Sequence, residues 1–336
     1  KIAINDFSKI CHLINIDIKK TNPLSILNSI SMGLNKIGKF IQYKKPELII
    51  LLGDRYEILS AAIGSIYNNV KIVHIHGGEV TTGSIDDTIR HAITKFSDFH
   101  FVSTATYKKR VIQMGENPQN VFNVGALGAE NAKNMKLINK KELQKTLSIK
   151  FSKYNFLITI NSFIEEKFTI ESLLKNFFFA LKKFKNTSFI FTMPNSDLKS
   201  DFIKSEILNF CKKNKNCYFF KFMGSKNYLS CINVCDLVLG NSSSGILEAP
   251  TLNTATVNIG DRQNGRVQAN SVINSENSSK EIYNSIKKSL SSNFKNKIKK
   301  TKNPYFKKNT AANIVKIIEK NILNKRNKPK EFYDIK

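Results

Sequence analysis

Acidic and histidine side chains gather in two short stretches in the first half of the sequence. Asp54 directly follows an apolar run, and His74 and His76 are followed by Glu79 across a pair of glycines. Asp86 comes a little later, at the start of an amphipathic stretch. Carboxylates and imidazoles are the groups that most often move protons in enzymes. Their convergence at neighbouring strand ends therefore predicts a proton-transfer site.

Each of these residues also has a simpler interpretation. Asp54 stands between a strand-like run and a helix-like stretch, so its carboxylate either caps the helix or lines a cleft. Strand alternation would place His74 and His76 on one face, with Glu79 just past the glycine turn. A metal site made from these histidines and acids is a second interpretation, although their spacing matches no strong zinc motif.

A different chemistry is indicated by the motif GNSSSG, residues Gly240–Gly245, which follows an apolar run. Small residues let the backbone approach a ligand closely, while helix N-terminal N–H groups and serine hydroxyls donate hydrogen bonds. The motif predicts a phosphate or diphosphate site, with an ordinary serine-rich N-cap turn as the alternative. It is not a Walker P-loop, because no Gly-Lys-Ser/Thr follows.

Two arginines, Arg262 and Arg266, lie beside glycines after another strand-like run. Guanidinium groups can bind phosphate oxygens through two parallel hydrogen bonds. The pair is therefore a second candidate for phosphate binding, although a solvated turn would explain the same pattern.

The elements that must position these groups alternate along the chain. Apolar runs at 48–52 and 71–76 are typical of buried parallel strands, and the first reads as buried on both faces. Helical periodicity follows at 55–66 and 86–96, and a second series of strands and helices begins near Asn155. This alternation predicts an α/β fold with parallel sheets, whose ligands lie at the carboxyl ends of the strands.

The length of 336 residues agrees with two domains of about 150 residues each. We place the boundary in a charged, strand-poor stretch, which gives domains 1–148 and 149–336. No apolar run approaches the roughly 18–20 residues of a membrane span, and no signal-peptide pattern opens the chain. The five cysteines show no framework spacing. We therefore predict a cytoplasmic protein with reduced thiols and no membrane partner.

The net charge of +27 arises from 53 Lys and Arg against 26 Asp and Glu. A chain this basic could bind nucleic acid. The lysines are scattered, however, and no recognition motif accompanies them. We predict a solvated lysine surface and no nucleic-acid partner.

Taken together, the motifs resemble the hydrolysing UDP-N-acetylglucosamine 2-epimerases, in particular the bacterial sialic-acid-pathway type. The resemblance is carried, in chain order, by LLGDRYE, HIHGGEVTTGSIDDTIRHAITK, VFNVGALGAEN, GNSSSGILEAP and NIGDRQNGR, with NPYFKKN and KEFYDI near the C-terminus. It implies two Rossmann-like domains in a glycosyltransferase-B-like arrangement with a cleft between them. It also implies a C-terminal helix that crosses back to the first domain.

The resemblance implies that UDP-N-acetylglucosamine and water are converted to N-acetylmannosamine and UDP. Anti elimination would give a glycal, which water then hydrates with inversion at C2. Such an enzyme needs a UDP-sugar but no metal or other cofactor, and relatives suggest a homo-oligomer, either a dimer or a tetramer. The alternative substrate within the family is UDP-2,4-diacetamido-2,4,6-trideoxyglucose, a legionaminic-acid precursor.

The resemblance also assigns roles to residues of this sequence. The catalytic candidates are Asp54, His76, Glu79 and Asp86, where His76 occupies a position at which some relatives have a glutamate. The substrate- and UDP-binding candidates are Arg55, Asn161, Asn241, Ser242, Ser243, Ser244, Gly245, Glu248, Arg262 and Arg266. Within that set, Ser242 and Ser243 match diphosphate binders, Glu248 the ribose-binding acid, and Arg262 a phosphate-side arginine.

Two departures from the family pattern bear on activity. The family's first strand and its Gly-Thr/Ser-Arg-Ala-Glu-like turn do not precede Lys1, so we expect an incomplete N-terminal domain. Asn161 stands where relatives carry histidine, and asparagine cannot titrate or carry charge near pH 7. A catalytically impaired UDP-sugar-binding protein is therefore a further alternative.

Overall fold

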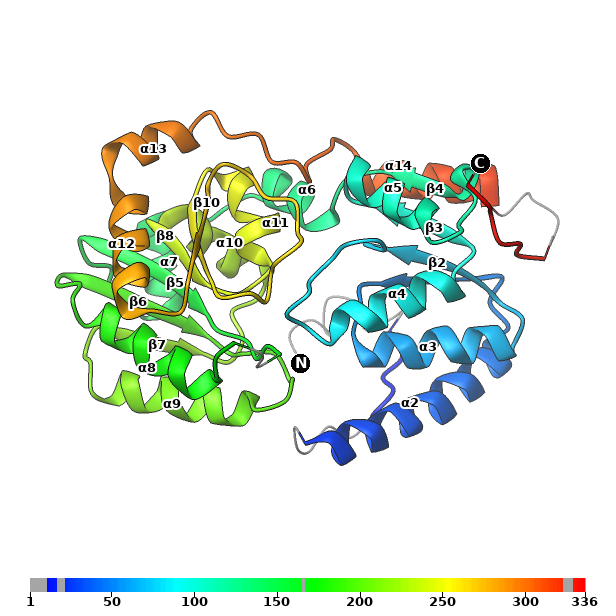
Figure 1. The fold of residues 1–336 in the computed structure, drawn as a ribbon, viewed down its shortest axis with the longest axis horizontal. Coiled ribbons are helices and arrows are strands. Elements are labelled where there is room, and N and C mark those ends of the chain that lie inside the picture. The colour runs from blue at the N-terminus through cyan, green and yellow to red at the C-terminus, as the bar shows by residue number, and fades with distance from the viewer. Residues whose placement is uncertain (1–10, 17–21, 165–166, 323–328, 336) are drawn as a thin grey trace. The chain divides into compact units, whose positions relative to one another are not determined.

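The computed structural model describes residues 11–16, 22–164, 167–322 and 329–335, and these fall into two compact units (Figure 1). The first unit holds the described residues of 11–81, 85–130 and 305–335, and the second holds 82–84 and 131–304. Apart from the short segment 82–84, the chain enters the second unit at Asn131 and returns to the first at Tyr305. The domain boundary expected after residue 148 stays a prediction.

The first unit is built on a parallel sheet with the strand order β1-β2-β3-β4. Its strands are β1 (Leu48–Leu52), β2 (Lys71–Ile75), β3 (Phe99–Val102) and β4 (Val121–Asn123). Its helices are α2 (Pro23–Lys44), α3 (Tyr56–Tyr67), α4 (Asp86–Phe96), α5 (Ala105–Gln113) and α14 (Thr310–Ile317), with a 3-10 turn η1 (Pro118–Asn120) and a π-helical turn η3 (Ile318–Ile322). Helix α6 (Leu127–Asn134) carries the chain into the second unit.

Apolar layers cover both faces of this sheet. On one face Val73 and Phe101 pack with Ile314 of α14, and on the other Ile72 packs with Ile93 of α4. The edge strand β1 departs from the prediction of burial on both faces, because Ile50 and Leu52 are about half exposed. Among the described residues β1 pairs only with β2, so one side of the strand lacks a neighbour.

The second unit contains a six-stranded parallel sheet in the order β10-β9-β8-β5-β6-β7. Its strands are β5 (Tyr154–Thr159), β6 (Thr187–Thr192), β7 (Cys217–Phe220), β8 (Leu237–Gly240), β9 (Ala255–Ile259) and β10 (Val272–Ser275). Its helices are α7 (Lys140–Leu147), α8 (Ile170–Leu181), α9 (Ser200–Lys212), α10 (Ser225–Val234), α11 (Ser244–Leu247), α12 (Ser279–Leu290) and α13 (Ser292–Ile298), with a 3-10 turn η2 (Ala249–Leu252). The predicted α/β class with parallel sheets is confirmed.

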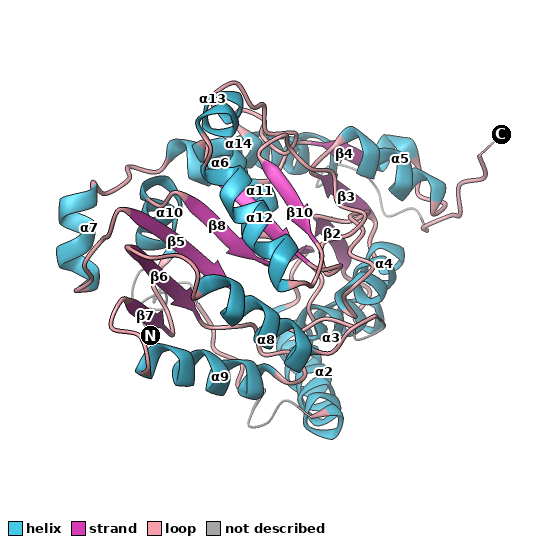
Figure 2. Cartoon of the chain, turned by 60° about the vertical axis from the view of Figure 1, so that its left-hand side comes forward, coloured by secondary structure: helices cyan, strands magenta, loops and turns pink. Residues whose placement is uncertain are grey.

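Alternate residues along the strands of this sheet enter opposite cores. Phe156 and Ile158 of β5 belong to a phenylalanine-rich core with α8, α9 and α12. Helices α8 and α12 lie in front of the strands in Figure 2. Leu157, between them, belongs to the core formed with α10. Each such fully buried side chain stabilises the fold by about 1.5–3 kcal/mol. Both faces are therefore covered, and the strand ends are left to carry polar groups.

The C-terminal segment 329–335 lies against the first unit. Lys330 donates from Nζ to the carbonyl oxygens of Lys95 and Ser97, at the end of α4, and to the buried carboxylate of Glu116. Among the described residues, no helix is both long enough and apolar enough to cross a bilayer.

Candidate active site

The predicted acid–histidine cluster of the first unit lies at the carboxyl ends of β1 and β2. Asp54 comes two residues after the end of β1, and His76 directly follows β2. The two strands are hydrogen-bonded neighbours, with Leu52 opposite Ile75. Parallel strands end at the same edge of a sheet, so the topology brings these residues together.

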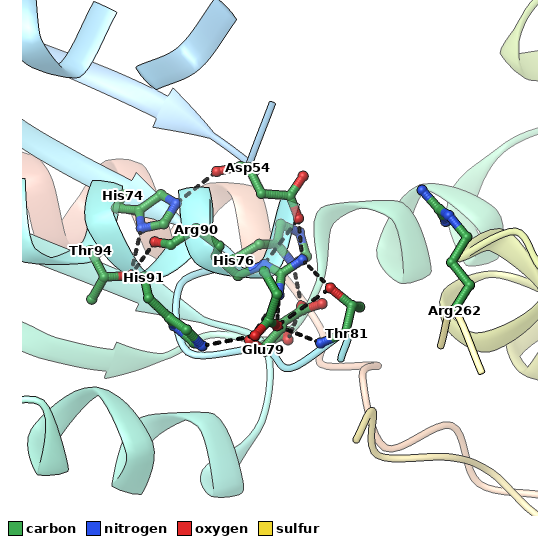
Figure 3. Close-up of polar contacts among 12 residues, drawn as sticks. Asp54, His74, His76, Glu79, Thr81, Arg90, His91, Thr94 and Arg262 are labelled. Atoms are coloured by element: carbon green, nitrogen blue, oxygen red, sulfur yellow. Dashed lines mark hydrogen bonds and ion pairs between the residues drawn. The ribbon is translucent and has the colours of Figure 1, made fainter. Parts of the chain in front are cut away.

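The buried guanidinium of Arg90, on α4, holds this cluster together (Figure 3). Its Nε donates to Oδ2 of Asp54 at 2.9 Å, and Nη2 donates to the same oxygen and to Oγ1 of Thr81 at 3.0 Å. Its Nη1 donates to the carbonyl oxygen of Glu79 at 2.8 Å and to Asp87 at 3.1 Å. Two carboxylates therefore share the single positive charge of the guanidinium, which also fixes the loop that follows β2.

These contacts decide between the two interpretations of Asp54. The cap of α3 is Arg55, which makes no side-chain capping bond, and Asp54 instead pairs with Arg90. Arg55 itself lies about 26 % exposed and pairs with Glu57 at 3.4 Å. Asp54 is consequently a charged group at a strand end rather than a helix cap.

His76 and Glu79 form a direct pair. Nδ1 of His76 lies 2.9 Å from Oε1 of Glu79, and the same oxygen accepts a hydrogen bond from Ser103 at 2.8 Å. The backbone of His76 is left-handed, with φ of 71°, so the strand alternation that would put His74 and His76 on one face stops before His76. Such a conformation costs a non-glycine residue about 1–3 kcal/mol and is common at functional sites.

The two acidic residues at the start of α4, Asp86 and Asp87, have different surroundings. Asp86 is buried there. Asp87 accepts hydrogen bonds from the Thr81 N–H and from Arg90. Burial alone would raise the pKa of Asp87, but the His91 and Thr81 hydrogen bonds and the Arg90 charge lower it to about 2.

Arg90 and Asp87 received no role from the motif analysis, although both lie in the stretch HIHGGEVTTGSIDDTIRHAITK. The signal present in the sequence was an arginine three residues after an acid, on the helix that begins with the predicted Asp86. That spacing puts both side chains on one helix face. It does not reveal that Asp54, 36 residues earlier, shares the same guanidinium.

In the second unit, the predicted binding residues lie where the strand order reverses. β5 is flanked by β6 on one side and by β8 on the other, and Asn161 and Asn241 follow β5 and β8. Such a switch point is where open parallel sheets bind ligands. The Asn161 N–H donates to Oδ1 of Asn241 at 2.7 Å, and Nδ2 of Asn241 donates back to the Asn161 carbonyl at 2.8 Å.

The serine motif continues from this bridge into the short helix α11. Ser242 and Ser244 are joined through their hydroxyl groups at 3.1 Å, and the Ser244 hydroxyl also bonds to that of the half-buried Tyr228. The N–H of Gly245 donates to the Ser242 carbonyl at 3.3 Å, so it is used within the motif. The side chains of Ser242 and Ser243 are half-buried.

The remaining predicted binding residues have more varied surroundings. Arg262 is buried, and its guanidinium donates to the carbonyl oxygens of Ser162 at 3.0 Å and Asn241 at 3.4 Å. It thereby braces the end of β5 as well as the serine motif. Glu248 and Arg266 are half-buried, at the end of α11 and in the turn after β9.

The metal interpretation finds no ligand set in the part of the chain that the structure describes. No group of three or more His, Cys, Asp or Glu side chains there has the geometry to hold a metal ion. Four histidines of the first unit are instead bonded to other side chains, namely His76 to Glu79, His74 to Thr94, His91 to Asp87 and His100 to Glu116.

Comparison with known proteins identifies the family of the chain. A model of the UDP-N-acetylglucosamine 2-epimerase family matches residues 3–319. The chain belongs to this family. It is 41% identical over 335 residues to the polysialic acid biosynthesis protein P7 of Escherichia coli, covering 99% of this chain and 85% of that protein.

Other members of the family differ in what they are reported to act on. The GDP/UDP-N,N'-diacetylbacillosamine 2-epimerase (hydrolyzing) of Campylobacter jejuni is 39% identical over 269 residues, covering 80% of this chain and 70% of that protein. The UDP-GlcNAc 2-epimerase of Methanocaldococcus jannaschii, solved with UDP-GlcNAc and UDP, superposes with a TM-score of 0.76 at 16% identity, covering 95% of this chain and 87% of that one. The glycosyltransferase-B-like fold expected for the family is thus the fold of this chain.

Proposed function

We propose that this epimerase-family protein is a hydrolysing UDP-N-acetylglucosamine 2-epimerase. It would convert UDP-GlcNAc and water to N-acetylmannosamine and UDP for sialic-acid-type sugar biosynthesis. The observation that carries the proposal is the cluster of carboxylates and an imidazole around buried Arg90 at adjacent strand ends. The identity with a polysialic acid biosynthesis protein supports the sialic-acid branch.

The proposed chemistry runs in two balanced steps. A base removes the proton from C2 of the sugar, the C2–H electron pair forms the C1=C2 double bond, and UDP leaves with the C1–O pair. Water then adds its hydroxyl group to C1 while a proton returns to C2 on the opposite face. Both steps need acid–base groups held in fixed positions.

The first unit offers two kinds of acid–base group, carboxylates and an imidazole. We assign Asp54 and Asp86 to proton transfer at C2, because Arg90 fixes the Asp54 carboxylate and Asp86 begins the same helix. We assign His76 to the water step. Its Nδ1 is held by Glu79, so Nε2 is the nitrogen that would exchange a proton.

The second unit is proposed to bind UDP. The hydroxyl groups of Ser242 and Ser243 would donate to the diphosphate, and Glu248 would accept from the ribose hydroxyls. Arg262 holds the backbone of Ser162 and Asn241 beside this motif and adds positive charge. Serine hydroxyl groups and a guanidinium donate hydrogen bonds and carry no negative charge, so they suit an anionic ligand such as a diphosphate.

Isotope labelling tests the reaction directly. The protein is incubated with UDP-GlcNAc in D₂O, and the products are followed by ¹H and ³¹P NMR. The two steps predict one deuteron at C2 of N-acetylmannosamine. In H₂¹⁸O they predict UDP without ¹⁸O, because the C1–O bond breaks. Product without deuterium at C2 would contradict elimination, and attack at phosphorus would place ¹⁸O in UDP.

A second candidate substrate is UDP-2,4-diacetamido-2,4,6-trideoxyglucose. The 39% identity to a hydrolysing diacetylbacillosamine 2-epimerase favours it. The same assay with both sugar nucleotides separates the candidates by their relative kcat/KM. Saturable UDP binding without turnover of either sugar would instead support the impaired binding protein.

A further inference from the structure

His74 is a buried histidine that the proposed reaction leaves without a role. It lies in β2, opposite Leu51 of β1 and His100 of β3, and none of its surface is exposed. Its Nε2 lies 2.8 Å from the carbonyl oxygen of Gly53, and its Nδ1 lies 3.1 Å from Oγ1 of Thr94. The ring therefore links the end of β1 to helix α4, as Figure 3 shows.

The partners of His74 define its protonation. A carbonyl oxygen only accepts hydrogen bonds, so Nε2 must carry a proton. Burial lowers the pKa of His74 to about 3, and the ring is therefore neutral at physiological pH. A neutral ring with a proton on Nε2 leaves Nδ1 as an acceptor. The single proton of the Thr94 hydroxyl is then shared between two acceptors, Nδ1 of His74 at 3.1 Å and the carbonyl oxygen of Arg90 at 3.0 Å, as a three-centre hydrogen bond.

The two partners of His74, Gly53 and Thr94, lie next to the Asp54–Arg90 pair. Gly53 has φ of +90° and immediately precedes Asp54, so its carbonyl orientation sets where the Asp54 backbone starts. Thr94 lies one helical turn after Arg90, and its hydroxyl is 3.0 Å from the Arg90 carbonyl oxygen. His74 thus contacts the backbone beside the carboxylate and the turn that carries the guanidinium.

The packing around the ring leaves little freedom. A Cβ at Gly77 would lie 2.9 Å from Oγ1 of Thr94 and 3.0 Å from Nδ1 of His74. The glycine after His76 is therefore required for the loop to pass over the His74–Thr94 contact. A loosely packed core histidine would not impose that requirement.

We infer that His74 is a positioning residue of the active site: a neutral imidazole with its proton on Nε2, which fixes Asp54 and Arg90 relative to each other and exchanges no proton during turnover. Its kinetic consequences rest on the proposed function. A displacement of about 1 Å at a reacting group can lower a rate about 100-fold, so a brace at this position affects kcat.

The kinetic test compares His74→Phe, which keeps a ring without nitrogen atoms, with His74→Gln, whose amide can still donate to Gly53. We expect kcat to fall about 100-fold in His74→Phe and less than about tenfold in His74→Gln, with KM little changed in both. Thr94→Val should lower kcat about tenfold, and Thr94→Ser should retain it. The matched control is His12→Gln, a substitution of an exposed histidine in the same unit.

Two kinetic outcomes would overturn the inference. An unchanged kcat in folded His74→Phe would make His74 an ordinary core residue. Loss of one limb of the pH–rate profile in His74→Gln would make it an acid–base group. If His74→Phe does not fold, the His74→Gln profile and the Thr94 pair still decide.

A spectroscopic test does not depend on activity. In wild-type protein with ¹⁵N-labelled histidine, His74 should show the Nε2–H tautomer and no titration from pH 5 to 9. The charged or titratable groups that face it are His100, Asp54 and Arg90. An Nδ1–H tautomer, or titration in this range, would contradict the inference that His74 is a neutral positioning residue. Absence of turnover by a wild-type protein with the expected spectrum would count against the proposed function alone.

Discussion

The two units hold their candidate site residues by different physical means. In the first unit, the carboxylates of Asp54 and Asp87 bond directly to one buried guanidinium, and His76 bonds to Glu79. In the second, asparagine and serine side chains bond to backbone atoms and to other neutral hydroxyl groups. The first is a network of opposed charges, whereas the second consists mostly of neutral hydrogen bonds around one buried guanidinium, Arg262, which lies 3.8 Å from the Asp197 carboxylate.

The difference matches the chemistry proposed for each unit. Groups that move protons must sit at fixed distances and in defined charge states, which buried ion pairs can provide. A site that binds a diphosphate gains affinity from hydrogen-bond donors that face the ligand, whereas carboxylates would repel it. The comparison therefore predicts that the first unit responds more strongly to the loss of a charge, and the second to the loss of a hydroxyl group.

Replacing the Asp54 carboxylate tests the largest expected difference. Asp54→Asn should lower turnover of UDP-GlcNAc by at least about 1,000-fold, because the amide cannot accept the C2 proton. UDP affinity, measured by calorimetry, should stay within about threefold of wild type. Glu47→Gln, an exposed charge in the same unit, is the matched control. Retained turnover would remove Asp54 from the mechanism.

Removing the central guanidinium should produce the largest loss of stability. Arg90→Met leaves the carboxylates of Asp54 and Asp87 without their shared partner, and we expect a loss of about 3–5 kcal/mol in the free energy of unfolding. Denaturant titration measures it. Arg262→Met in the second unit should cost less, about 1–3 kcal/mol, since it removes two carbonyl contacts and one long ion pair, at 3.8 Å to Asp197. Equal losses would contradict the contrast between the units.

Acidification should destabilise the first unit before the second. All five histidines of the sequence, His12, His74, His76, His91 and His100, belong to the first unit. Burial lowers the pKa values of His74 and His100, so the unfolded chain binds protons below about pH 6.5 that the folded chain does not. For His74 the resulting loss is about 2 kcal/mol between pH 6.5 and 5.

A second loss should follow at lower pH, from Glu116. Burial alone would raise its pKa, but the contacts with His100, Lys330 and Lys95 lower it to about 2. Its stabilisation is therefore complete above about pH 4.5 and is lost as the pH falls toward 2. Hydrogen exchange followed by mass spectrometry should show β2 and β3 exchanging before β5 and β8. Earlier exchange in β5 and β8 would contradict the prediction that acid destabilises the first unit before the second.

The smallest expected effect comes from one hydroxyl group in the second unit. Tyr228→Phe removes the bond to Ser244 and should lower stability by about 1 kcal/mol and UDP affinity by about threefold. Tyr218→Phe, which removes a hydroxyl group bonded to Lys150, is the matched control and should leave UDP affinity unchanged. A Tyr228→Phe protein with wild-type affinity would separate Tyr228 from the serine motif.

The sequence by itself determined the kinds of elements and the places where they end. Apolar runs and helical periodicity give β1, α3, β2 and α4 close to their observed bounds, and the motif after β8 marks the switch point. These signals are local, because periodicity and turn residues act over a few positions. The candidates Asp54 and His76 follow from them, since both come just after a predicted strand.

Only the tertiary structure decided which of these groups meet. Arg90 reaches Asp54 across 36 residues, and His74 reaches both Gly53 and Thr94. The exposure of β1 and the left-handed turn at His76 also depend on strand order and loop geometry. No local pattern encodes these contacts, because they arise from the register of parallel strands joined through helices.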